Sequence, residues 1–264
     1  SFNIVSGNLQ AAGNLSAGTY NIRVRATDLA GNTIDQTFTI TVTAGPSVAS
    51  INRAGATALT NATSVDYTVT FSESVTQVDV TDFQLTSTGT AGGTISSVTG
   101  TGSTYTVTVS GLSGDGTLRL DLKNTGTGIV NGGSQAITGG FTSGQTYTLD
   151  TTAPTLSIST VATDDAINDA EDESSVTVSG TSSGADGQTV TVNVGGTSKT
   201  ATVAAGGAWS VTLTSAEVKA LTQGNISITA DVNDAAGNAA TQATKTVVYD
   251  KTAPTAPSAP DMTA

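Results

Sequence analysis

The sequence of 264 residues contains no cysteine and no histidine, and only 4% of its residues are aromatic. Without cysteine, disulfides and thiolate metal sites are excluded, so disulfides cannot provide the stability that a secreted protein needs. Without histidine, Ser-His-Asp and Cys-His catalytic arrangements and histidine-ligated zinc are excluded as well. No apolar run is long enough to span a membrane. The first ten residues carry no signal-peptide pattern, so we interpret the N-terminus as a cut inside a larger protein.

Basic residues are scarce, because nine Lys and Arg stand against 21 Asp and Glu and leave a net charge of −12. Nucleic-acid binding needs cationic side chains that neutralise phosphates, and binding to anionic lipid needs a basic surface. The composition therefore argues against a nucleic-acid partner and against membrane insertion. An acidic surface favours solubility and can hold cations.

Runs in which apolar and polar residues alternate occur along the whole chain, in a composition rich in Thr, Ser, Val and Gly. Such alternation is typical of half-buried strands, and Thr and Val suit a pleated sheet. A single short helical turn is predicted at 215–221. We predict an all-β protein of tandem immunoglobulin-like or cadherin-like β-sandwich domains in a linear array. The predicted strands cover residues 20–26, 38–42, 67–71, 105–109, 118–122, 176–178, 190–194, 209–213 and 226–230.

One segment occurs twice, at a spacing that suits one sandwich domain. LDTTAPTLSI and YDKTAPTAPS share Asp, Thr, Ala and Pro, and their Asp residues are Asp150 and Asp250. Proline interrupts strand pairing and stiffens the chain, so both segments are predicted to link tandem domains. Another junction is predicted at Gly45-Pro46. The predicted units are 1–44, which is too short for a complete core, 45–151, 152–251 and 252–264.

The stretch Asp-x-Ala-Gly-Asn occurs twice, in RATDLAGNT and in DVNDAAGNA, each time after a predicted strand. Gly and Asn tolerate positive φ, so a hairpin turn by itself explains the stretch. Its oxygens can also bind calcium, which takes about six to eight oxygen ligands and so needs a second segment. In an immunoglobulin-like sandwich this loop lies where the chain enters the domain. We therefore predict a calcium site in the third unit with the ligands Asp150, Asp231, Asp234 and Asn238.

The junction before the middle unit lacks this combination. Asp234 precedes the next linker acid, Asp250, by 16 residues. Sixteen residues before Asp150 lies Ser134. Sixteen residues after Asp28, the Asp of the first copy of the motif, lies Ala44. Neither the linker nor the loop carries an acid there, so we predict that this junction binds no metal.

A denser acidic segment, DDAINDAEDE, lies at 164–173, where a sandwich would have the loop after its first strand. Its carboxylates repel one another unless solvent or a cation screens them. A solvated loop explains the segment, and sandwich topology places it at the exit end of the domain, where it could share a calcium site with the next domain. The candidate ligands there are Asp164, Asp165, Asn168, Asp169, Glu171 and Asp250, with Asp172 and Glu173 completing the cluster.

Other conspicuous side chains have simpler interpretations. In the middle unit, Glu73, Asp79 and Asp82 could be ligands, but exposed positions at a strand edge are the simpler interpretation. Asp115, in Gly-Asp-Gly, is interpreted as a turn residue. Trp209 is the one tryptophan, and its alternating strand predicts a place in the core rather than on a sugar-binding face.

Several stretches resemble repeats of giant bacterial adhesins. In the third unit, GTSSGADGQTVTVNVGG, GAWSVTLTSAEVKAL and ITADVNDAAGNAA resemble bacterial immunoglobulin-like repeats of biofilm-associated adhesins secreted by type I systems. SVDYTVTFSESVTQVDVTDFQL looks like another such repeat, and GTYNIRVRATDLAGNTIDQTFTITV is similar to cadherin-like repeats. The resemblance implies extracellular tandem sandwiches with calcium at their junctions. Asp28 and Asn32 would then serve a junction to a preceding domain.

These features favour a structural extender of a cell-surface adhesin, stiffened by calcium, that projects an adhesive tip for adhesion or biofilm formation. Its partners would be neighbouring repeats of the same chain, and regions outside these residues would bind the host or biofilm surface. The alternatives are a carbohydrate- or protein-binding module and a subunit of a surface layer or filament. An enzyme is not expected, because the carboxylates lie in linkers and loops rather than in an aromatic-lined cleft.

Overall fold

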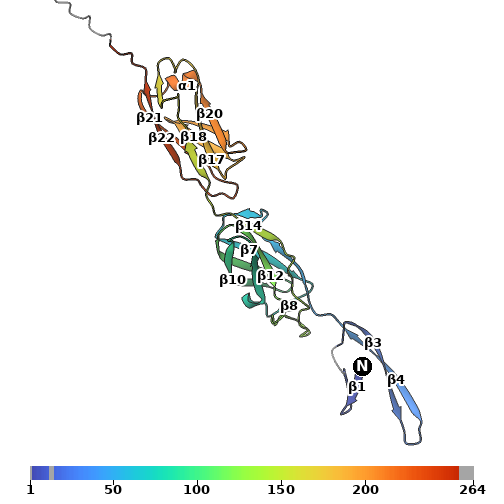
Figure 1. Cartoon of the computed structure of the whole chain (residues 1–264). Helices are drawn as coiled ribbons and strands as arrows, with labels where there is room; N and C mark the ends of the chain where they lie inside the picture. Colours follow the sequence, from blue (N-terminus) through green and yellow to red (C-terminus); the bar gives the residue numbers. More distant parts are fainter. Residues whose placement is uncertain (1, 12–14, 256–264) are drawn as a thin grey trace, which may run out of the picture.

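The computed structural model describes residues 2–11 and 15–255 and confirms the all-β prediction. Figure 1 shows three units arranged end to end: a pair of hairpins, a middle sandwich and a third sandwich. Every strand predicted from alternation lies within an observed strand. In the described part of the chain, no helix has the length and apolar character needed to cross a membrane.

The middle unit consists of two four-stranded sheets that enclose one apolar core. One sheet has the order β10-β11-β7-β5 and the other β6-β14-β12-β9, while β8 and β13 form a separate pair. Pairing is antiparallel except between β6 and β14. A 3-10 turn, η1 (Val80–Asp82), precedes β9. The strands are β5 (Val48–Arg53), β6 (Leu59–Thr60), β7 (Ser64–Phe71), β8 (Val75–Thr76), β9 (Phe83–Ser87), β10 (Gly92–Thr101), β11 (Thr104–Ser113), β12 (Gly116–Leu122), β13 (Val130–Asn131) and β14 (Thr146–Leu149).

Alternation decides which side chains enter the middle core. In β7, the side chains of Tyr67, Val69 and Phe71 are buried, and the residues between them are not. Tyr67 packs edge-to-face on Tyr147 of the opposite sheet, with ring centroids 5.3 Å apart. Its hydroxyl donates to the carbonyl O of Leu118 at 2.7 Å, so the one polar atom of this core ring is satisfied.

The third unit is a sandwich of a three-stranded sheet, β15-β17-β20, and a five-stranded sheet, β16-β22-β21-β18-β19. Trp209 is only 3% exposed, which confirms its predicted place in the core. The predicted helical turn is α1 (Ser215–Lys219), which begins after a capping box formed by Thr214 and Glu217. The strands are β15 (Thr155–Ile158), β16 (Ala166–Asn168), β17 (Val176–Ser183), β18 (Thr189–Val194), β19 (Thr197–Thr202), β20 (Ala208–Leu213), β21 (Gly224–Asp231) and β22 (Ala243–Asp250).

The first unit contains two hairpins, β1 (Phe2–Val5) with β2 (Asn8–Ala11) and β3 (Gly18–Thr27) with β4 (Thr33–Val42). Of its described residues up to 43, none is buried, and Phe38 is 46% exposed. This agrees with the expectation that the unit has no complete core. Two-stranded hairpins are marginally stable by themselves.

Candidate functional site

The joint between the middle and third units is formed by the linker 150–154 and the loop between β21 and β22. Asn238 of this loop donates its Nδ2 to the carbonyl O of Asp150 and to Oδ2 of Asp234, each at 2.8 Å. Asn61 of the middle unit adds a bond across the joint, because its Nδ2 donates to Oδ1 of Asn238 at 3.2 Å. The structure thus brings together the linker and the loop that the sequence paired.

Asp234 organises this loop from within. Its Oδ1 accepts hydrogen bonds from the N–H groups of Ala236, Gly237 and Asn238 at 2.8–2.9 Å. Gly237 has a φ of +99°, which explains the glycine of the motif. Partial burial raises the pKa of the Asp234 carboxyl, but the hydrogen bonds led by Asn238 outweigh it, and the pKa is lowered overall.

As arranged, these residues do not fit a calcium ion. Calcium takes about six to eight oxygens, whereas the Asn238 amide nitrogen, a donor, lies between oxygens of Asp150 and Asp234. Asp231 does not join them, because both of its carboxylate oxygens accept from Nε2 of Gln242. Over residues 2–11 and 15–255, no three or more acidic side chains gather closely enough to hold a metal. Calcium at this joint therefore stays a prediction from the sequence.

Asp115, in the turn between β11 and β12, holds the same linker from the middle unit. Its Oδ1 accepts from the N–H of Thr151 at 2.6 Å and from the Thr151 hydroxyl at 3.1 Å. Its Oδ2 accepts from the hydroxyl of Thr152. The bonds from Thr152 and Thr151 lower the pKa of the Asp115 carboxyl. Asp115 is a turn residue as predicted, but the sequence did not indicate that it also binds the linker.

The joint between the first and middle units is built from an equivalent loop, residues 131–135. Asn131 accepts from the N–H groups of Gly133 and Gln135 through Oδ1, at 3.0 and 2.9 Å. Gln135 donates Nε2 to the carbonyl O of Thr43 at 2.9 Å, and its Oε1 accepts from the Thr43 hydroxyl at 3.0 Å. A linker carbonyl therefore accepts from a loop amide at both joints.

This loop corrects the residue equivalence drawn from the sequence. The counterpart of Asp234 is Asn131 rather than Ser134, because the isolated bridges Val130–Ala136 and Asn233–Ala239 frame the two loops in the same way. A constant offset missed it, since the connection from loop to linker is longer in the middle unit. Asn131 is neutral, as Ser134 is, so the metal-free first joint remains a prediction.

Close backbone contact replaces charge at the first joint. A Cβ on Gly45 would lie 2.2 Å from the carbonyl O of Ala136, so only glycine fits there. Pro46 is buried, and its carbonyl O accepts from both the N–H and the hydroxyl of Thr138, at 2.8 and 3.1 Å.

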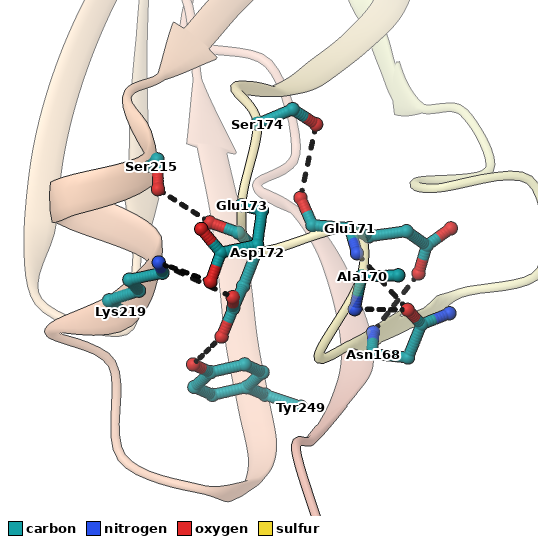
Figure 2. A network of polar contacts seen from close by, with 9 residues as sticks. All are labelled: Asn168, Ala170, Glu171, Asp172, Glu173, Ser174, Ser215, Lys219 and Tyr249. Atoms are coloured by element: carbon teal, nitrogen blue, oxygen red, sulfur yellow. Dashed lines mark hydrogen bonds and ion pairs between the residues drawn. The ribbon is translucent and has the colours of Figure 1, made fainter.

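The acidic segment 164–173 is not simply a solvated loop. Asp172 is 2% exposed, and its Oδ2 accepts from the hydroxyl of Tyr249 at 2.6 Å (Figure 2). Lys219 of α1 lies 3.9 Å from Oδ1 of Asp172 and pairs with Glu173 at 2.6 Å. The bond to Asp172, together with burial, raises the pKa of Tyr249 to about 12. Interpreting this part of the segment as solvated was wrong, because α1 covers it.

The other predicted ligands of this segment are mostly used as local hydrogen-bond acceptors. Asp164 accepts from the N–H of Ala166 at 3.0 Å, and Asp169 is exposed in the turn after β16. Asp165 accepts from the N–H of Val161 at 2.8 Å and pairs with Lys245 at 2.9 Å.

Asn168 and Glu171 bond each other's backbone. Glu171 accepts from the N–H of Asn168 at 3.0 Å, and Asn168 accepts from the N–H of Glu171 at 3.1 Å (Figure 2). The register of β16 on β22 places Asn168 opposite Asp250, so the acidic segment does lie beside Asp250, as predicted. Asp250 itself accepts from Gln223 at 2.8 Å.

The loop of the first unit has an Asp–Asn pair that bonds as the pair in the third unit does. Asp28 accepts from the N–H groups of Ala30 and Asn32 through Oδ1, and from Nδ2 of Asn32 through Oδ2, all at 2.8–2.9 Å. These bonds, led by the Asn32 side chain, lower the pKa of the Asp28 carboxyl. Neither residue contacts a linker within the described residues.

In the middle unit, the interpretation of three acids as exposed strand-edge residues is wrong for Asp82. This residue is 0% exposed, in η1, and its Oδ2 accepts from the N–H of Asp79 at 2.8 Å. Burial raises the pKa of Asp82 to about 6. Glu73 is exposed and accepts from Nδ2 of Asn131 at 3.3 Å, so it lies at the first joint.

Comparisons with known proteins point to one kind of domain. A family model described as a putative Ig domain matches residues 2–43. Among solved structures, a bacterial immunoglobulin-like domain from the M. primoryensis ice-binding adhesin is 35% identical, covering 38% of this chain and 99% of that one, with a TM-score of 0.31. No curated protein matches the chain.

Two longer solved structures are also similar. A Ca2+-stabilized adhesin with which an Antarctic bacterium binds ice is 26% identical, covering 90% of this chain, with a TM-score of 0.45. This chain spans 58% of that structure's length. A further structure, from work on the host cell surface retention of a 1.5-MDa bacterial ice-binding adhesin, is 21% identical, covers 89% of this chain and 75% of that one, and has a TM-score of 0.43.

Proposed function

We propose that this chain, which belongs to the family of bacterial immunoglobulin-like domains, is an extender segment of a large bacterial cell-surface adhesin. Its units follow one another end to end (Figure 1). Each joint leaves only five residues between strands, 43–47 and 150–154. The observation that carries the proposal is that Asp115 and Asn238 bind the second linker from both sides. Such bonds favour a rod over a chain of freely hinged domains.

The proposal assigns a mechanical role and no catalysis. Asp115, Asp172 and Asp234 accept hydrogen bonds that shape joints or cores, and in this role they need no substrate. The segment would lie outside the cell and project an adhesive tip, whose ligand on a host or biofilm surface is bound by regions beyond these residues.

Small-angle X-ray scattering of the 264-residue chain tests the extender function. We expect a maximum dimension that matches units arranged end to end, and a scattering curve that this one arrangement fits. A compact particle, or a curve that only a broad ensemble of bent shapes fits, would contradict the proposal.

Calcium is proposed for the second joint alone, where the Asn238 side chain would have to move aside to admit it. This part of the proposal is supported by the acids Asp150 and Asp234 in the linker and the loop, and by the likeness to a Ca2+-stabilized adhesin. An ion there would compete with the Asn238 amide for the carbonyl O of Asp150 and for Oδ2 of Asp234. We expect chelation to loosen the second joint and to leave the first joint, whose loop and linker carry no acid, unchanged. An equal response at the two joints would remove calcium from the proposal.

A further inference from the structure

The strands β12 and β21 occupy the same place in their units, because each pairs with the last strand of its sandwich. The register places Gly116 opposite Leu149 in one unit and Gly224 opposite Tyr249 in the other. The residues that precede these glycines, Asp115 and Gln223, therefore lie beside the point where the chain leaves the unit.

Both residues bind the threonine of Asp-x-Thr-Ala-Pro. The hydroxyl of Thr152 donates to Oδ2 of Asp115, and Nε2 of Gln223 donates to the hydroxyl oxygen of Thr252. The linker is also folded locally, because the N–H of each threonine donates to Oδ1 of the Asp two residues before it, at 3.2 Å for Thr152 and 2.9 Å for Thr252.

Building on the extender function proposed above, we propose that these contacts form a linker clip that fixes the direction in which the chain leaves each sandwich. The linker clip comprises the residue before the first glycine of β12 or β21 and the threonine of the following Asp-x-Thr-Ala-Pro. After Thr152, only Ala153 precedes Pro154, which is buried beside Gly184 of the third unit. Fixing Thr152 on the middle unit therefore orients the third unit as well.

The first joint lacks both halves of the linker clip. Gly18 begins β3 opposite Val42, as Gly116 does opposite Leu149. The residue before Gly18 is Ala17, and the linker position equivalent to Thr152 is Gly45. Neither side chain can form a hydrogen bond, so the first joint serves as a natural comparison without a clip.

The clip does not depend on one charge state. Asp115 is anionic and accepts the bond from its threonine, whereas Gln223 is neutral and donates to its threonine. A hydroxyl can take either role, which explains why threonine serves in both linkers. The clip is therefore distinct from a calcium site, which would need anionic oxygens at each joint.

Distance measurements between spin labels test the clip directly, and the absence of native cysteine leaves the labels without background. Cysteines replacing the exposed Thr99 and Thr200 report on the second joint. We expect a narrow distance distribution in the parent chain. Asp115→Ala and Thr152→Val should each raise the population of bent arrangements about tenfold, the factor expected for losing a hydrogen bond to a charged group.

Two controls keep the test specific. Asp66→Ala removes an exposed acid of the same unit whose side chain accepts from Thr108, and it should leave the distribution unchanged. Thr152→Ser keeps the hydroxyl and should preserve the narrow distribution. Thermal unfolding should show that all variants remain folded.

The outcome separates the clip from the extender function. If the parent distribution is narrow and stays narrow in Asp115→Ala and Thr152→Val, with and without chelator, the clip is overturned and the extender function stands. A distribution already broad in the parent chain would overturn both. Broadening in both variants, in calcium and in chelator alike, would establish the clip.

Discussion

The two joints of this chain are built from equivalent loops, residues 131–135 and 234–238, but these loops hold their linkers differently. At the first joint, neutral Gln135 binds Thr43, and Gly45 lets the backbone approach Ala136 closely. At the second joint, Asn238 binds Asp150 and is itself braced by the carboxylate of Asp234. Of these two linkers, the second is also bound by a side chain of the preceding unit, Asp115, and among the described residues the first has no such bond.

The difference shows that close backbone packing and a side-chain clip are alternative ways to fix a short linker. The first joint cannot acquire a clip, because a threonine at position 45 would need a Cβ where the Ala136 carbonyl lies. The second joint can also carry charge, since its loop presents Asp234 where the first presents Asn131. We therefore expect the second joint to respond to pH and to cations, and the first to respond to side-chain volume.

The largest effect is expected from Gly45→Thr, which would place in the first linker the threonine that the second linker has at position 152. The added Cβ meets backbone rather than a flexible side chain, so the middle unit should lose about 2 kcal/mol of unfolding free energy. Denaturant unfolding measures the loss. Gly132→Ala is the matched control, because nothing lies within 4 Å of the added Cβ there. Equal stability of the two variants would show that the close approach does not constrain the joint.

A smaller effect is expected when the loop side-chain amide that binds the linker, Asn238 or Gln135, is removed. Asn238→Ala deprives the carboxylate of Asp234 and the carbonyl of Asp150 of a donor and should cost the third unit about 1–2 kcal/mol. Gln135→Ala removes only neutral contacts and should cost about 0.5–1 kcal/mol. Thermal unfolding of the two variants compares them. If Gln135→Ala lost more unfolding free energy than Asn238→Ala, the charged carboxylate of Asp234 would not be what strengthens the second joint.

The smallest effect is expected from acid. The pKa values of Asp115 and Asp234 are both lowered in the folded chain. Their contribution is therefore fully present above the ordinary Asp pKa of about 4 and is lost as the pH falls through the lowered values. The second joint should loosen in that window while the first, held by Gln135 and Thr43, does not. Among the residues that the structure describes, Glu73 is the one acid whose side chain bonds the first loop, through Asn131.

Distances between spin labels placed on either side of each joint, measured at pH 7 and near pH 3, would show whether the second joint alone loosens. Asp115→Gln introduces the residue that the third unit has at the equivalent position, Gln223. This variant should reduce the loosening of the second joint by acid. Loosening of both joints together would mean that the acid acts on the domains rather than on the linker.

Much of the fold was predictable because its signals are local. Strand alternation identified β7 and β12, and proline with Asp-x-Thr marked the linker at Asp150. The burial of Trp209 followed from the same alternation. The acids that the sequence treated as exposed, Asp82 and Asp172, were misjudged, because no local pattern shows that η1 or α1 will enclose them.

The candidate site was predictable only in part. The sequence paired Asp150 with Asp234 and Asn238 through the expected topology, and these residues do meet. It did not find the equivalence of Asn131 with Asp234, because connection lengths differ between the sandwiches. Nor did it find the bond from Asp115 to Thr152, since these residues lie far apart in the chain.

By itself, the sequence determined nine of the strands and the all-β sandwich class, and it marked the proline-bearing linkers, because side-chain alternation and proline act on neighbouring residues. Only the tertiary structure decided which side chains hold each linker. Strand register brings Asp115 and Gln223 beside the exits of their units, and register is set by the packing of whole sheets rather than by any short stretch.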